Sequence, residues 1–124
     1  MTIIDTSVWV ARFLVDDPSH DEATHTLEEL DGVLKHTCHT VIEETATVLC
    51  YKYSKEQADK FVQWIMDNPD VVILEHDIAS EADLFLSVDA DLSFADVSII
   101  SLSQQHDLHI TSFDKQLLEV VNSV

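Results

Sequence analysis

Four carboxylates in this sequence stand where a solvent-exposed acid is not expected, and together they point to cation chemistry. They are Asp5, Glu44, Asp96 and Asp114. Asp5 ends an apolar run, and Asp114 stands three residues before Leu117 on the apolar face of an expected helix. A carboxylate directed at a core costs free energy unless a positive charge shares its site. Four of them predict a pocket for divalent metal ions.

The helical spacing of two of these acids carries much of this hypothesis. Glu44 lies three residues after Val41 and four before Val48, so it shares their face of a helix. Asp96 lies four residues before Ile100 in the same way. A solvated acid belongs on the opposite face of such a helix.

Carboxylate oxygens are the ligands that Mg²⁺ and Mn²⁺ prefer. Two such ions about 4 Å apart can hold the attacking and leaving oxygens of a phosphodiester displacement, and one ion can activate water. The sequence leaves open one ion or two. The alternative is that each acid has an ordinary structural role, in which Asp5 or Asp114 would cap a helix and Glu44 and Asp96 would be partly solvated.

The composition predicts one globular domain spanning residues 1–124, since 46% of the residues are apolar. There are 24 acidic residues against 6 lysines and arginines, and the net charge is −18. This balance is typical of a halophilic protein; in molar salt the Debye length is about 3 Å, so repulsion of RNA phosphates is screened. The alternative is an acidic protein that avoids polyanions.

Neither a membrane span nor a targeting segment is expected. No apolar run approaches the roughly 18 residues that a transmembrane helix needs, and the N-terminus resembles neither a signal nor a transit peptide. Cys38 and Cys50 are expected to be reduced thiols. We therefore expect a cytoplasmic protein.

The elements that must position the acids alternate along the chain. Strands are expected at residues 2–5, 33–38, 71–74 and 108–111, and helices at residues 6–15, 19–30, 40–53, 55–67, 77–86, 93–105 and 113–122. Ser19 with Glu22 has the spacing of a capping box, and Ser54 is the expected cap of the helix after it. Alternation predicts a parallel sheet covered by helices on both faces.

The ligand crevice of such a sheet lies beyond the carboxyl ends of its strands. Asp5 ends the first strand, Glu44 follows the second, Asp96 begins a helix after the third and Asp114 follows the fourth. The four acids are therefore expected at one edge of the sheet. The aromatic residues, by contrast, are expected in the core or an interface rather than as a platform for bases; they are Trp9, Phe13, Phe61, Trp64, Phe85 and Phe94.

Around these acids the chain resembles the PIN-domain ribonucleases. The resemblance rests on four segments in order, Ile3-Ile4-Asp5-Thr6-Ser7, Thr40-Val41-Ile42-Glu43-Glu44, Leu92-Ser93-Phe94-Ala95-Asp96 and Thr111-Ser112-Phe113-Asp114-Lys115, which together span nearly the whole chain. The compact size looks most like the VapC toxins of toxin–antitoxin pairs.

The resemblance implies a three-layer α/β/α fold with a short parallel sheet of about four to five strands. It implies a Mg²⁺- or Mn²⁺-dependent endoribonuclease whose metal-binding and catalytic acids are Asp5, Glu44, Asp96 and Asp114, with Thr6 and Ser112 as supporting hydroxyls. It also implies an RNA substrate and a small basic antitoxin as partner. Apolar helix faces would serve that antitoxin or a homodimer.

Several alternatives remain open in the sequence. Glu43 could replace Glu44 as the ligand, although Glu44 fits the apolar spacing better. The domain could be a catalytically inactive PIN-like module whose acids hold a partner's basic side chains. It could also be a phosphoacceptor receiver domain, although the single Asp5 after the first strand argues against this.

Overall fold

The computed structural model describes residues 1–123 and contains one four-stranded sheet, in the order β3-β2-β1-β4. The strands are β1 (Thr2–Ile4), β2 (Lys35–Cys38), β3 (Val71–Leu74) and β4 (His109–Thr111). All neighbouring pairs are parallel, with Thr2 opposite both Lys35 and His109. The expected parallel α/β sheet is confirmed, with four strands.

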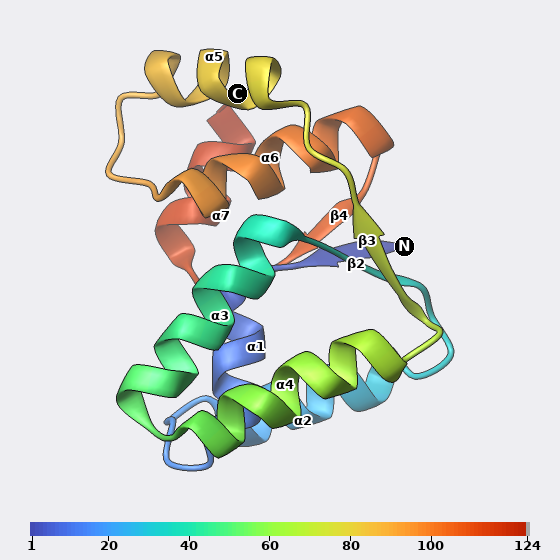
Figure 1. The fold of residues 1–124 in the computed structure, drawn as a ribbon. Coiled ribbons are helices and arrows are strands. Elements are labelled where there is room, and N and C mark those ends of the chain that lie inside the picture. Colours follow the sequence, from blue (N-terminus) through green and yellow to red (C-terminus); the bar gives the residue numbers. More distant parts are fainter. Residues whose placement is uncertain (124) are drawn as a thin grey trace.

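Within residues 1–123, seven helices cover the two faces of the sheet, so that helices and sheet together form three layers. They are α1 (Thr6–Phe13), α2 (His20–Glu29), α3 (His39–Lys52), α4 (Lys55–Asp67), α5 (Ile78–Ser87), α6 (Phe94–His106) and α7 (Lys115–Ser123). Figure 1 shows α5, α6 and α7 above the sheet and α1, α2 and α4 below it. Helix α3 packs against α1 and α4 and also contacts α6, so it closes one end of the molecule.

The core explains why β1 and α1 hold their positions. All three residues of β1 are buried, and Trp9 of α1 is fully buried. The Trp9 ring lies 5.9 Å from that of Phe61 and 5.5 Å from that of Trp64, both on α4. These aromatic contacts fix α1 against α4, and α1 begins directly after Asp5.

The helix caps confirm one prediction and correct another. The Ser54 hydroxyl accepts a hydrogen bond from the backbone N–H of Gln57 at 3.2 Å, as expected for a cap. The capping box predicted at Ser19 is wrong, because its side chain caps nothing. Its backbone has φ −97° and ψ 10°, outside the extended region that a capping residue needs, and its N–H is bound by Asp17.

Most element bounds lie within two residues of those predicted. Helix α1 ends at Phe13 rather than at residue 15, and β2 begins at Lys35 rather than at residue 33. Both cysteines are free, and Cys38 is buried. Among the described residues, no helix is long and apolar enough to cross a membrane.

Candidate active site

A cleft of about 410 Å³ gathers the candidate residues. The carboxyl ends of β1, β2 and β4 face the same edge of the sheet, from which α1, α3 and α7 lead away (Figure 1). The cleft there is lined by Asp5, Thr6, Ser7, Glu44, Asp91, Ser93, Asp96 and Asp114. Five of these eight residues are acidic and none is a lysine or an arginine, so the lining offers no cation to balance them.

Asp5 lies at the base of the cleft and is only partly satisfied. Asp5 is only 2% exposed. One carboxylate oxygen, Oδ2, accepts hydrogen bonds from the hydroxyls of Ser7 at 2.8 Å and Ser112 at 2.7 Å. The other oxygen, Oδ1, is buried and has no hydrogen-bond partner among the described residues. A buried acceptor of this kind calls for a ligand or an ion.

The two serines that bind Asp5 also accept backbone hydrogen bonds from the loop after β4, and the one to Ser7 joins α1 to that loop. Ser7 accepts a hydrogen bond from the backbone N–H of Phe113 at 3.1 Å, and Ser112 accepts one from that of Asp114 at 2.9 Å. The backbone N–H of Asp5 donates to Thr111 at 2.9 Å. The hydroxyls of Ser7 and Ser112 are thus free to donate to Asp5, which fixes the orientation of that carboxylate.

Asp96 stands in the first turn of α6, where it forms a reciprocal capping box with Ser93. Its carboxylate accepts from the Ser93 N–H at 3.1 Å, and the Ser93 hydroxyl accepts from the Asp96 N–H at 3.0 Å. Burial raises the pKa of Asp96 to about 6, and the nearby carboxylates of Asp5 and Glu44 act in the same direction. The hydrogen bonds from Ser93 oppose this shift. The negative charge of the cleft therefore contributes to the raised pKa of Asp96.

Asp114 caps α7 from the rim of the cleft. Its Oδ1 accepts from the N–H groups of Gln116 at 3.0 Å and Leu117 at 3.3 Å. The capping role considered as an alternative is therefore present, but it occupies one oxygen while the residue still lines the cleft.

The structure separates the two neighbouring glutamates of α3. Glu44 is half-buried and lines the cleft. Glu43 is exposed, lies outside the acidic cleft and approaches His39 at 3.7 Å. Of the two acids before Ser93, Asp91 lines the cleft and Asp89 does not.

The cleft is not a preformed metal cage. Within residues 1–123, no three histidine, cysteine, aspartate or glutamate side chains are gathered closely enough to hold one ion. Like charges without a counter-ion repel one another, and here hydrogen bonds hold Asp96 and Asp114 to their own helices. The hydroxyl of Thr6 is also buried without a partner among these residues, so it could reorient toward a ligand.

Two cleft residues, Ser7 and Ser93, have roles that the sequence analysis did not assign, whereas the sequence leaves Asp91 open as an outer ligand or a solvated acid. Ser7 and Ser93 each bind a candidate acid, and Asp91 adds a fifth acid to the lining. Ser7 stands two residues after Asp5, and Ser93 stands three residues before Asp96, which is the spacing of a capping box. That spacing is the signal in the sequence, although Asp is less usual than Glu or Gln in its third position.

Comparison with known proteins places this architecture in a family. The sequence matches the PIN domain over residues 2–122. The chain belongs to the PIN-domain family. This assignment removes the receiver-domain alternative, and the PIN domain accounts for the three layers described above.

A solved structure has the same fold. It is the VapC20 toxin of Mycobacterium tuberculosis, a toxin that cleaves the sarcin–ricin loop. Its structure superposes with a TM-score of 0.87 at 19% sequence identity, covering 97% of this chain and 95% of that one. A search of curated proteins finds no match.

Proposed function

We propose that this PIN domain is a divalent-metal-dependent endoribonuclease. The observation that carries the proposal is the unpartnered, buried Oδ1 of Asp5 in a cleft lined by five acids and no basic residue among those described. Leaving a buried charged acceptor unsatisfied costs more than about 1–3 kcal/mol, so a cation is the natural complement. The fold and the PIN-domain match support hydrolysis of RNA as the reaction.

The donors in the cleft suit a hard ion. They are carboxylate and hydroxyl oxygens, without a histidine or cysteine in the described lining, which favours Mg²⁺ or Mn²⁺ over zinc. Asp5, Glu44, Asp96 and Asp114 would hold the metal. When bound, one or two such ions supply charge stabilisation of the phosphodiester and activation of water.

The chain's own residues prepare the cleft for this chemistry. Ser7 and Ser112 hold one oxygen of Asp5 and leave the other without a bond to either hydroxyl. Asp96 binds a cation only when deprotonated, and because its pKa is raised to about 6 it holds its proton to a higher pH than an ordinary aspartate does. The carboxylates repel an RNA phosphate until cations neutralise them, so the substrate is admitted only to the loaded site.

A cleavage assay tests the proposal. A labelled single-stranded RNA is incubated with the purified chain in molar KCl with Mn²⁺ or Mg²⁺, then with chelator. We expect cleavage that chelator abolishes and that is lost in Asp96→Asn, with Asp83→Asn, an acid on α5 outside the cleft, as the matched control. An inactive PIN-like module would bind the metal and cleave nothing. Cleavage unchanged in Asp96→Asn would place the activity elsewhere or in a contaminant.

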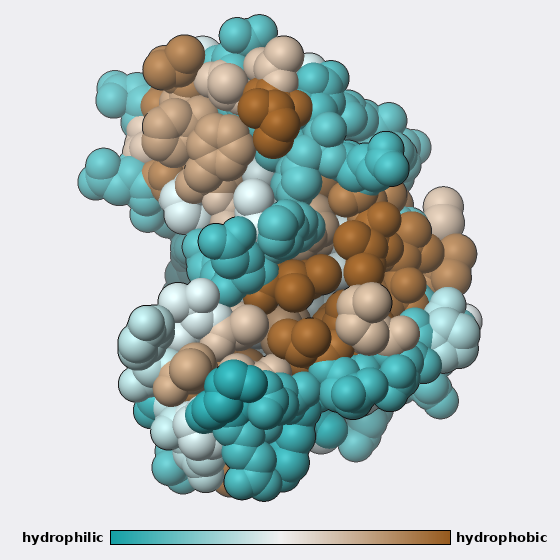
Figure 2. All heavy atoms as spheres, viewed as in Figure 1, coloured by the Kyte–Doolittle hydropathy of each residue, from teal (hydrophilic) through white to brown (hydrophobic). Residues whose placement is uncertain are grey.

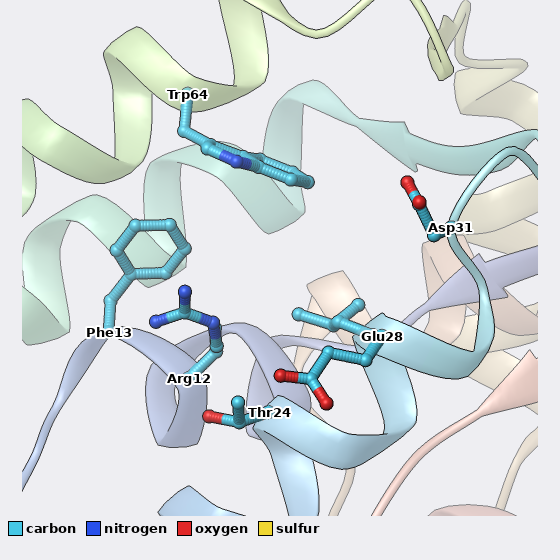
Figure 3. Close-up of a pocket in the computed structure, with 7 residues that line it drawn as sticks. Arg12, Phe13, Thr24, Glu28, Asp31 and Trp64 are labelled. Atoms are coloured by element: carbon cyan, nitrogen blue, oxygen red, sulfur yellow. The ribbon is translucent and has the colours of Figure 1, made fainter.

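We further propose that the chain is the toxin of a toxin–antitoxin pair, held by a small basic partner. A cavity of about 290 Å³ lies between α1, α2 and α4. In Figure 3 the Phe13 ring lies next to the guanidinium of Arg12, and Trp64 lies beyond that ring. The acids Glu28 and Asp31 stand on the other side of the cavity. Apolar rings beside carboxylates suit a helix that carries both apolar and basic residues.

The partner is tested by co-expression. The open reading frame next to this gene is expressed with the tagged chain, and we expect a small basic protein to co-purify and to stop RNA cleavage. Glu28→Gln, at an exposed residue of the cavity, should weaken this capture without lowering cleavage by the free chain. A homodimer is also expected, and sedimentation of the free chain measures it. An active monomer with no such neighbour would instead be a stand-alone nuclease.

The charge of −18 supports a halophilic setting, and the free thiols of Cys38 and Cys50 support a cytoplasmic one. Self-repulsion destabilises a compact acidic domain when it is unscreened. We expect the melting temperature to rise steeply from low salt to molar KCl. A flat response would remove the halophile proposal and leave RNA binding without screening.

A further inference from the structure

A second groove continues the acidic cleft along α3 and the start of α6. It has a volume of about 370 Å³ and is lined by Thr40, Glu43, Glu44, Thr47, Val48, Ser93, Phe94 and Ala95. Glu44 and Ser93 line both this groove and the acidic cleft. A ligand in the acidic cleft can therefore extend into the groove past these two shared residues.

The groove carries an exposed aromatic ring. Phe94, the first residue of α6, is 36% exposed, and Phe85 of α5 is 42% exposed. Their ring centroids lie 5.5 Å apart with the planes inclined by 35°. In Figure 2, hydrophobic side chains gather over α5 at the top of the view. The aromatic residues were expected in the core or in an interface, and the rings of Phe85 and Phe94 lie outside the core.

Electrostatics decide what kind of ligand such a groove takes beside this cleft. The groove lining contains two carboxylates and no lysine or arginine among the described residues, and Lys35, one of only six lysines and arginines in the chain, is buried. Direct phosphate contacts, which usually dominate RNA affinity, have no cationic donors in this lining. Stacking of a base on an aromatic ring needs no positive charge and persists in high salt.

We propose that the groove is a nucleobase subsite, in which a base next to the scissile phosphate of single-stranded RNA stacks on Phe94, with Phe85 supporting that ring. The inference rests on the proposed nuclease function and adds the substrate contact that the acids cannot make. The carboxylate of Glu43 stands at the groove as an acceptor, and the hydroxyls of Thr40 and Thr47 can accept or donate. The carboxylate favours a base that offers amino hydrogens, such as cytosine, adenine or guanine, over uracil.

Kinetics of the full chain test the subsite first. Phe94→Ala should raise KM about 5- to 150-fold, which corresponds to about 1–3 kcal/mol of stacking per base, with kcat changed much less. Phe94→Trp should keep a KM near that of the unaltered chain, because it keeps an aromatic face. Leu86→Ala removes an exposed apolar residue of α5 outside the groove and is the matched control. Melting curves establish that each variant is folded.

A binding measurement separates the subsite from the nuclease proposal. Phe94→Trp is combined with Asp96→Asn and titrated with a 12-nucleotide single-stranded oligoribonucleotide in Mn²⁺, then with the same oligonucleotide made abasic. We expect the fluorescence of the introduced tryptophan to be quenched by the intact oligonucleotide and not by the abasic one. If the variant showed this quenching but the unaltered chain cleaved no RNA, the nuclease proposal would be wrong and the subsite would still stand.

Three outcomes would overturn the inference. A KM that Phe94→Ala leaves unchanged would do so while the nuclease function stood, and so would equal quenching by the abasic strand. A loss of dimer on sedimentation of Phe94→Ala, with KM unaltered, would assign the ring to contact with a second copy of the chain.

Discussion

Two clusters of buried acid in this molecule contrast sharply. Glu81 of α5 is fully buried, with His76 Nδ1 2.9 Å from both of its carboxylate oxygens and the Ser98 hydroxyl donating to Oε1. Asp5 is almost as deeply buried, but only one of its oxygens has partners among the described residues. The first cluster joins α5 to α6, whereas the second opens into a cleft.

The difference teaches how a structural acid differs from a site acid. Glu81 has a basic side chain and a hydroxyl placed against it by the fold, so its burial is compensated without a ligand. The acids around Asp5 share one cleft, and serine hydroxyls and backbone N–H groups are their donors. Removing the carboxylate should therefore destabilise the fold at Glu81 and abolish function, with little loss of stability, at Asp5.

The largest expected effect is on stability at Glu81. Glu81→Ala removes the carboxylate partner of His76 and leaves Ser98 only the Phe94 carbonyl, and it should lower the free energy of unfolding by about 3–5 kcal/mol. Glu81→Gln keeps the shape and an acceptor and should cost about 1–3 kcal/mol. Urea unfolding in molar KCl measures both. A cost below that of a substitution at a less buried acid, such as Asp83→Asn, would mean that the cluster is not structural.

The sequence alone could not have separated these clusters. Glu81 stands three residues before Leu84 and seven before Val88, so it satisfies the same criterion of an acid on an apolar helical face. What distinguishes it is its contact with His76 and Ser98, and Ser98 lies on another helix. Partners of this kind are known only once α5 and α6 are packed.

Local patterns, by contrast, predict the elements well. Strand–helix alternation indicates the parallel sheet, and the expected cap at Ser54 is confirmed. The error at Ser19 arises because its N–H is bound by Asp17 and its backbone leaves the extended region. The gathering of the four acids in one cleft follows from the rule for strand ends. The exposure of Phe94 does not, because it depends on how α5 packs beside α6.

The second prediction is the opposite of the first, because a substitution at Asp5 should reduce activity and not stability. Asp5→Asn removes a carboxylate from an unbalanced acidic cleft, so metal-free stability should stay equal or rise. Substituting a residue that only contacts a metal ligand typically lowers metal affinity or activity by about 10–100-fold. Asp5 is itself a proposed ligand, so RNA cleavage should fall more than about a hundredfold. Melting curves with and without Mn²⁺ accompany the assay. A variant that unfolds as readily as Glu81→Ala would place Asp5 among the structural acids.

The third prediction concerns the hydroxyl that orients Asp5. Ser112→Ala removes one of the two donors to Oδ2 and should weaken Mn²⁺ binding about 10- to 100-fold. Ser87→Ala, at the exposed end of α5, is the control. Titration calorimetry measures the affinity directly, so the result does not depend on cleavage. Equal affinity in both variants would mean that Ser7 alone positions the carboxylate.

The smallest expected effect is a dependence on pH that arises from Asp96 in the cleft. The pKa of Asp96 is raised from 3.8 to about 6, so the folded chain without metal holds this proton more tightly than the unfolded chain does. The resulting stability is fully present below about pH 3.8 and is lost as the pH rises through about 6.

A bound cation competes with the same proton, so Mn²⁺ affinity should be constant above about pH 6 and fall about tenfold per pH unit below it. Manganese titrations between about pH 5 and 8 measure this affinity, beside Glu81→Gln, which should show the same profile. If affinity stayed level down to about pH 5, the proton on Asp96 would not compete with the metal, and Asp96 would have to be removed from the ligand set.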